Sequence, residues 1–137
     1  MKERLFTGIP FVLAGLLIAF GPITIFPVCA ITHDMIMKCH WTARAEHGVG
    51  LVIAALGLLT VLVKLPAFRL GLSAAVILSA VTALLLPTVL IGVCSSHNMA
   101  CRILTLPALT VISTLTIIGA AVNSGLLVKK IKKGETE

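Results

Sequence analysis

Cysteine, histidine and methionine residues gather in two short stretches that lie between long hydrophobic segments. The two stretches share an order of residue types: Cys29, His33, Met35 and Cys39 in the first, and Cys94, His97, Met99 and Cys101 in the second. Thiolate, thioether and imidazole groups are ligands of soft and borderline metals such as Cu(I), and cysteine pairs can form or exchange disulfides. The pattern predicts that the chemistry of this chain is concentrated in these two stretches.

The simplest use of the cysteines is structural. Disulfides between Cys29 and Cys39 and between Cys94 and Cys101 would staple each stretch, and each would contribute about 2 to 4 kcal/mol by restricting the unfolded chain. The four cysteines allow three pairings, and crossed pairs would instead join the two stretches. The spacing alone does not choose among these pairings.

A second use is a soft-metal or haem site, with copper and haem as the candidate cofactors. The candidate ligands are His33, Met35, Cys39, His40, Cys94, His97, Met99 and Cys101. Neither stretch carries the Cys-x-x-Cys of a structural zinc site or the Cys-x-x-Cys-His of covalent haem attachment.

A third use is thiol–disulfide exchange, in which one cysteine pair would pass electrons to the other pair or to a quinone. If the chain forms four membrane helices with both cysteine pairs outside the cytoplasm, it resembles the architecture of the membrane disulfide-forming proteins and of vitamin K epoxide reductase. Those families keep a Cys-x-x-Cys near a helix end, and the intervals in this chain are longer.

The elements that must position these residues are membrane helices. Of the 137 residues, 58% are hydrophobic and 12% are charged, with a mean hydropathy of +1.13, which is incompatible with an ordinary soluble surface. Apolar runs cover roughly residues 5–28, 49–63, 68–93 and 103–128, and the second run can be lengthened by residues 45–48. We therefore predict an all-α integral membrane four-helix bundle, in which residues 1–137 form a single domain.

The distribution of lysine and arginine sets the expected orientation. One side of a four-span arrangement carries Lys2, Arg4, Lys64, Arg69, Lys129, Lys130, Lys132 and Lys133, and the other carries only Lys38, Arg44 and Arg102. Both termini are therefore expected in the cytoplasm, and the cysteine stretches outside it, where disulfides persist. On this view Glu46 also lies outside, where it could pair with a cation or belong to a solvated helix end. The net charge of +6 needs no nucleic-acid partner, because a basic tail attracts anionic lipid headgroups.

An internal repeat extends from the cysteine stretches into the helices. Pro22 precedes Cys29 by the same interval as Pro87 precedes Cys94. We expect two tandem helical hairpins, at about residues 5–65 and 66–130, related as parallel repeats. The prolines should kink the first and third helices near their outer ends.

Small and polar residues predict how the helices pack. A stripe of small residues on the third helix should allow a neighbouring helix to approach closely: Gly71, Ala75, Ser79 and Ala83. Polar residues on the fourth helix, among them Asn123 and Ser124, can bond to their own helix or across to a neighbour. Trp41 is expected to anchor the second helix at the outer membrane interface, or to stack on a bound ring.

Several strings carry a family resemblance. Residues 26–29 (Phe-Pro-Val-Cys), 38–42 (Lys-Cys-His-Trp-Thr), 91–94 (Ile-Gly-Val-Cys) and 99–101 (Met-Ala-Cys) resemble the signatures of the domain-of-unknown-function family 4418. The resemblance implies a small four-span protein of the bacterial cytoplasmic membrane and supplies no reaction. It also implies ABC-type transporter subunits as partners.

The function expected from the sequence is that of a non-enzymatic accessory or sensor subunit of a membrane transport system. Its outer Cys/His/Met cap would be disulfide-stapled or would bind a soft metal or haem. The alternative is a membrane thiol–disulfide oxidoreductase with two extracytoplasmic cysteine pairs.

Overall fold

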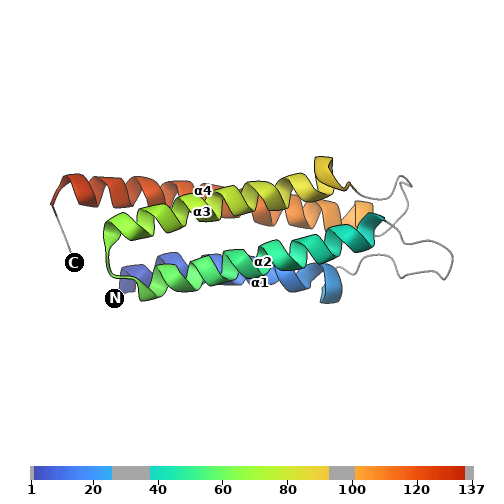
Figure 1. Ribbon diagram of the computed structural model, residues 1–137, viewed down its shortest axis with the longest axis horizontal. Helices are drawn as coiled ribbons and strands as arrows, with labels where there is room; N and C mark the ends of the chain where they lie inside the picture. The colour runs from blue at the N-terminus through green and yellow to red at the C-terminus, as the bar shows by residue number, and fades with distance from the viewer. Residues whose placement is uncertain (1, 26–37, 93–100, 135–137) are drawn as a thin grey trace.

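The computed structural model describes residues 2–25, 38–92 and 101–134, and these residues are almost entirely helical. The helices are α1 (Lys2–Thr24), α2 (Lys38–Leu62), α3 (Pro66–Leu85), the π-helical turns η1 (Leu86–Leu90) and η2 (Cys101–Thr105), and α4 (Leu106–Lys132). Within the described ranges there is no β-strand. Four long helices run antiparallel in chain order, and both termini lie at the same end of the bundle (Figure 1).

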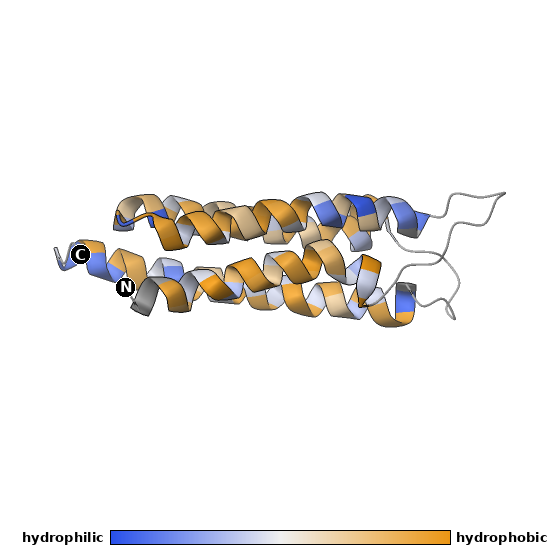
Figure 2. Cartoon of the chain, turned by 90° about the horizontal axis from the view of Figure 1, so that it is seen from below, coloured by the Kyte–Doolittle hydropathy of each residue, from blue (hydrophilic) through white to orange (hydrophobic). Residues whose placement is uncertain are grey.

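All four helices are long and apolar enough to cross a membrane. Their candidate spans are Leu5–Thr24, His40–Leu62, Pro66–Leu90 and Arg102–Lys132. Many of the large apolar side chains are exposed on the outside of the bundle, and hydrophobic residues predominate along most of the length of the helices (Figure 2). Such a surface is suited to contact with lipid chains. The prediction of an all-α integral membrane four-helix bundle is confirmed.

The second span is longer than its apolar run suggested. Helix α2 begins at Lys38, and its span covers 23 residues. The sequence shows an apolar run of residues 49–63 that residues 45–48 could lengthen, with Trp41 as the interfacial anchor of the helix. In the structure residues 40–48 are regular helix within the span, and their polar side chains divide between the exposed face and the interior of the bundle.

The α1–α2 contact depends on glycine. A methyl group at Gly15 would lie 2.7 Å from the carbonyl oxygen of Gly50, and one at Gly57 would lie 2.8 Å from the amide nitrogen of Val12. Both distances are too short for a carbon atom, so only glycine permits this separation of the two backbones. Close approach through small residues is the usual means of packing helices in a membrane, where lipid removes most of the hydrophobic driving force.

The stripe predicted on α3 does not lie along a single helix contact. Ala83 is buried, Ala75 and Ser79 are half-buried, and Gly71 is exposed with nothing within 4 Å of where its Cβ would be. The face of α3 that packs inward instead includes Leu72, Val76, Ala80 and Ala83. Residues spaced four apart move gradually around the helix, because an α-helix has 3.6 residues per turn, so the predicted stripe leaves the inward face.

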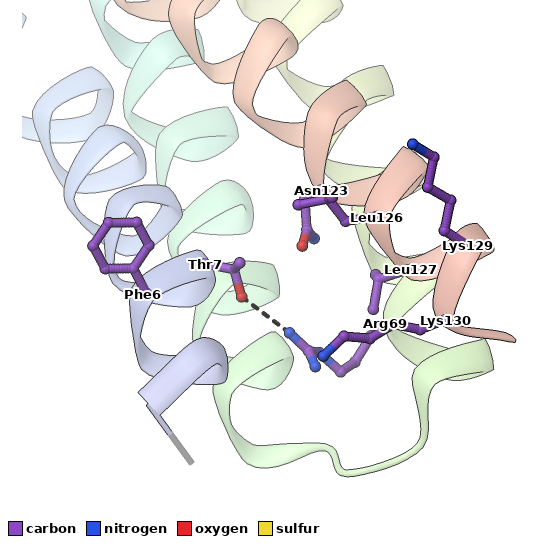
Figure 3. Close-up of a pocket in the computed structure, with 8 residues that line it drawn as sticks. All are labelled: Phe6, Thr7, Arg69, Asn123, Leu126, Leu127, Lys129 and Lys130. Carbon is purple, nitrogen blue, oxygen red and sulfur yellow. Dashed lines mark hydrogen bonds between the residues drawn. The ribbon is translucent and has the colours of Figure 1, made fainter. Parts of the chain in front are cut away.

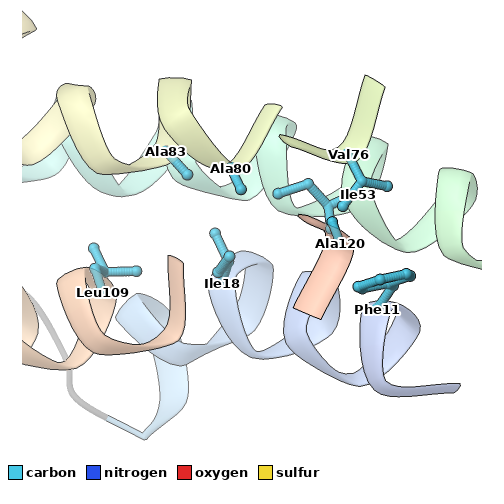
Figure 4. Close-up of a cluster of buried hydrophobic side chains, with 8 residues drawn as sticks. All are labelled: Phe11, Ile18, Ile53, Val76, Ala80, Ala83, Leu109 and Ala120. Carbon is cyan, nitrogen blue, oxygen red and sulfur yellow. The ribbon is translucent and has the colours of Figure 1, made fainter. Parts of the chain in front are cut away.

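The centre of the bundle is a cluster of apolar side chains contributed by all four helices (Figure 4). Its buried members are Phe11, Ile18, Ile53, Val76, Ala80, Ala83, Leu109 and Ala120. Alanines on α3 and α4 face larger residues on α1 and α2, so large and small side chains fill the interior together.

Candidate functional site at the cysteine end of the bundle

The helix ends that lead into the two cysteine stretches lie at the same end of the bundle, opposite the termini (Figure 1). Helix α1 ends at Thr24 and α2 begins at Lys38, while η1 ends at Leu90 and η2 begins at Cys101. We call this the cysteine end. The fold therefore brings the two hairpins together where their sequences carry cysteine, histidine and methionine.

Most of the predicted cap residues lie outside the described ranges. These are Cys29, His33, Met35, Cys94, His97 and Met99. For Cys39 and Cys101 the structure places the backbone only, as the second residue of α2 and the first residue of η2. In the described part of the chain, no three His, Cys, Asp or Glu side chains come together as a metal site. The cysteine pairing and the metal or haem ligands thus remain predictions.

Thr42 links the two hairpins at the cysteine end. Its hydroxyl lies 2.9 Å from the carbonyl oxygen of Gly92, to which it can donate, and 3.3 Å from the carbonyl oxygen of Lys38 in its own helix. Gly92 has a φ of +77°, a conformation that glycine adopts without the clash a Cβ would cause. The turn at Gly92 therefore directs a backbone carbonyl to a buried hydroxyl on α2.

Glu46 lies one helical turn deeper than Thr42 on the same face of α2. Its side chain is fully buried, and neither carboxylate oxygen has a hydrogen-bond partner among the described residues. The expectation that Glu46 belongs to a solvated helix end is wrong. A buried carboxylate without a partner is costly, and an ionisable group inside a membrane span commonly marks a functional site.

His47 connects α2 to the end of α1. Its Nδ1 lies 3.0 Å from the carbonyl oxygen of Ala19, to which it donates, and its ring meets Phe20 edge to face at 5.2 Å. Pro22 follows in the next turn of α1, where it lacks the N–H that would bond to the carbonyl of Ile18. His47 is therefore a half-buried packing residue beside a proline-interrupted turn, and the sequence had shown it only as a polar residue near a helix end.

His40 and Trp41 occupy the first turns of α2. Trp41 is 54% exposed and meets the half-buried His40 edge to face, with ring centroids 6.3 Å apart. An exposed indole at the start of a membrane-spanning helix is in the position that an interfacial anchor occupies. The exposed Arg44 follows on the same helix.

Pro22 and Pro87 are both fully buried, but they act differently. Pro22 stays within α1, close to its end at Thr24. At Pro87 the α-helix gives way to η1, where the N–H of Ile91 bonds to the carbonyl of Leu86 at 3.0 Å. The wider π register accommodates a residue that has no N–H to donate, and such turns are frequent at functional sites.

Fold and site together define the class of this protein as a multi-pass integral membrane protein, with four spans and a buried carboxyl group near one end. The model of the family described as "Domain of unknown function (DUF4418)" matches residues 11–126, and the chain belongs to this family. The resemblance inferred from the Cys-His-Trp-Thr string and the other motifs is thereby confirmed. No curated protein and no solved structure matches the chain.

Proposed function

We propose that the protein is a non-enzymatic accessory or sensor subunit of a membrane transport system in the bacterial cytoplasmic membrane. Its termini lie in the cytoplasm, and an outer cap is formed by the two Cys/His/Met stretches. Transporters of the ABC type are the proposed partners. The observation that carries the proposal is the meeting of four helix ends at the cysteine end, joined there by the bond between Thr42 and Gly92.

Two further features support a sensing role for the cap. Glu46 is buried in the bundle near the cysteine end, so a change in that end could act on a group whose burial is already costly. The π turns at residues 86–90 and 101–105 lie at the same end, where helix register is less regular than in the rest of the bundle. Formation of a disulfide, or binding of a soft metal or haem, in the cap would thus change the conformation of the adjoining helix ends.

The repeat is part of the same proposal. Two hairpins of similar sequence, at about residues 5–65 and 66–130, would each contribute one stretch to the cap. The burial of both Pro22 and Pro87 near the cysteine end supports this correspondence.

The test is intact mass spectrometry of the protein purified from membranes without reductant, before and after thiol alkylation, together with elemental analysis. Four blocked thiols without metal support a disulfide-stapled cap. Free thiols with stoichiometric copper or iron support the metal or haem form. Free thiols without bound metal or haem would contradict the proposed cap.

One observation favours the alternative, a thiol–disulfide oxidoreductase. Cys39 and Cys101 each fall within the first two residues of a helix, where backbone dipoles stabilise a thiolate. An oxidoreductase should form a trapped mixed disulfide with a partner when Cys29 or Cys94 is replaced by serine. A structural staple would leave the same variants without such an adduct.

A further inference from the structure

A cleft of about 550 Å³ opens between α1, α3 and α4 at the end of the bundle that carries the termini (Figure 3). Its walls include Phe6 and Leu126, which are 84% and 54% exposed. Its inner surface includes Arg69 and Leu127, which are buried. The cleft is therefore apolar toward the surrounding lipid and basic toward the bundle.

Hydrogen bonds hold Arg69 in place at the base of the cleft. The guanidinium Nη2 donates to the hydroxyl of Thr7 on α1 at 3.0 Å. The Ser73 hydroxyl donates to the Arg69 carbonyl oxygen at 3.0 Å, and the Asn123 amide on α4 donates to the Ser73 hydroxyl at 2.8 Å. Thr7 thus holds the guanidinium from α1, while Asn123 joins α4 to α3 one turn away, and Figure 3 shows the guanidinium directed across the cleft toward α1.

Two lysines bring more positive charge to the same cleft. Lys129 and Lys130 line it from the last turns of α4. Eight lysines and arginines of the described residues belong to helix ends and the connection at this end of the bundle. A ligand with a negative charge and an apolar body would complement both parts of the cleft.

We propose that this cleft binds an anionic phospholipid, with the phosphate near Arg69, Lys129 and Lys130 and an acyl chain along Phe6 and Leu126. The planar guanidinium matches a phosphate group, and the lysines add point charges. Arg69 lies in the first turn of the span Pro66–Leu90, which is the depth of lipid headgroups, and basic pockets between membrane helices are known to bind such headgroups. The proposal requires only that the helices span the membrane, and it does not depend on the proposed outer cap.

Native mass spectrometry of the full chain in detergent tests the proposal, with phosphatidylglycerol as the probe, phosphatidylcholine as the uncharged comparison and inorganic phosphate as competitor. The test variant is Lys129→Gln with Lys130→Gln. The matched control is Lys132→Gln with Lys133→Gln, which removes the same charge from the same tail outside the cleft.

The wild-type protein should retain phosphatidylglycerol in preference to phosphatidylcholine. The Lys129/Lys130 variant should bind phosphatidylglycerol at least about tenfold more weakly, and the Lys132/Lys133 control should change much less. Equal losses in the two variants would overturn the proposal, because they would show diffuse attraction to the tail. Equal binding of both lipids would also overturn it, as would displacement of the lipid by millimolar phosphate, which would indicate a general anion site.

Substitution of the buried cation provides a second test. Arg69→Lys retains the positive charge but loses the planar guanidinium group that can donate two parallel hydrogen bonds to a phosphate. It should therefore also weaken retention of phosphatidylglycerol. If this variant does not fold, the two lysine variants decide the proposal without it.

Discussion

Replacing Gly50 by alanine should force α1 and α2 apart. The added methyl group would lie 2.7 Å from the carbonyl oxygen of Gly15 and 2.8 Å from the Cα of Ala19. Ordinary van der Waals contact begins at 3.4 Å, so the two backbones must separate by at least about 0.7 Å. A gap of this size forfeits about a quarter to a half of the dispersion attraction of the atoms concerned. Both partners are backbone atoms, so no side chain can move aside to relieve the contact.

Gly48→Ala is the matched control for this substitution. Gly48 lies two residues away in α2, and nothing lies within 4 Å of its missing Cβ. Both variants gain the same helix propensity, so the difference between them isolates the steric effect. We expect Gly50→Ala to be less stable than Gly48→Ala by about 1 to 3 kcal/mol, the usual cost of overpacking.

The assay is reversible unfolding of the purified protein in mixed micelles by titration with SDS. Trp41 is the only tryptophan and serves as the fluorescence probe, with circular dichroism following helix content. An equal unfolding midpoint for the two variants would refute the reasoning, because it would show that the α1–α2 contact does not depend on glycine.

Three further predictions concern polar groups inside the bundle, and each uses the same unfolding assay. Thr42→Val should destabilise the protein by about 0.5 to 1.5 kcal/mol, because it removes the hydrogen bond to the carbonyl oxygen of Gly92. Thr82→Val is the control and should have little effect, because Thr82 is exposed and its hydroxyl bonds to its own helix. Equal effects of the two substitutions would argue against the link from α2 to Gly92. Asn123→Ala should cost about 0.6 to 1.7 kcal/mol through loss of its bond from α4 to α3, and an unchanged midpoint would contradict that bond. Glu46→Leu should leave the free energy of unfolding unchanged or raise it by up to about 4 kcal/mol, because the variant removes a buried carboxyl group that has no hydrogen-bond partner among the described residues. A large loss of stability would contradict this and would show that Glu46 binds a group outside the described residues.

Hydropathy and basic charge were sufficient to predict the number and order of the helices. Four apolar runs and basic ends require four spans, whatever the detailed packing. Trp41 was placed correctly near the start of the second helix, but the apolar run stopped at residue 49, or 45 when lengthened, because Arg44, Glu46 and His47 lower the local hydropathy. The span begins at His40, with Arg44 outward and Glu46 inward. Burial of a carboxyl group depends on which face meets the neighbouring helices, and hydropathy averaged over a window does not contain that information.

The contacts between helices could likewise be predicted only in part. The sequence drew attention to Gly71 on α3, but the structure uses glycines on α1 and α2. A signal for them was present, because Gly8 and Gly15 are seven residues apart, as are Gly50 and Gly57. Seven residues return to nearly the same side of a helix after two turns, so each pair forms a stripe on one face. Which stripes face each other depends on the pairing of the helices, which the sequence of a single chain does not reveal.

The cleft at Arg69 could not be predicted from position alone. A basic residue just after Pro66 is expected at a membrane edge, where it would be solvated. Its burial depends on contacts with residues far away in the sequence: Thr7 on α1 accepts a hydrogen bond from its guanidinium, and Asn123 on α4 bonds to Ser73, one turn along α3. The expectation that Asn123 could bond across to a neighbouring helix is confirmed, and Ser124 bonds to the carbonyl oxygen of Ala120 in its own helix.

The most direct test of the account is the location of the cysteine end relative to the membrane. Intact cells carrying the Lys132→Cys variant would be treated with a membrane-impermeant phosphine reductant and maleimide, and the labelled positions identified by peptide mapping. The account predicts that Cys29, Cys39, Cys94 and Cys101 are labelled in intact cells, and that a cysteine at position 132 is labelled only after the membrane is permeabilised. Labelling of position 132 in intact cells, with the native cysteines protected until permeabilisation, would contradict it.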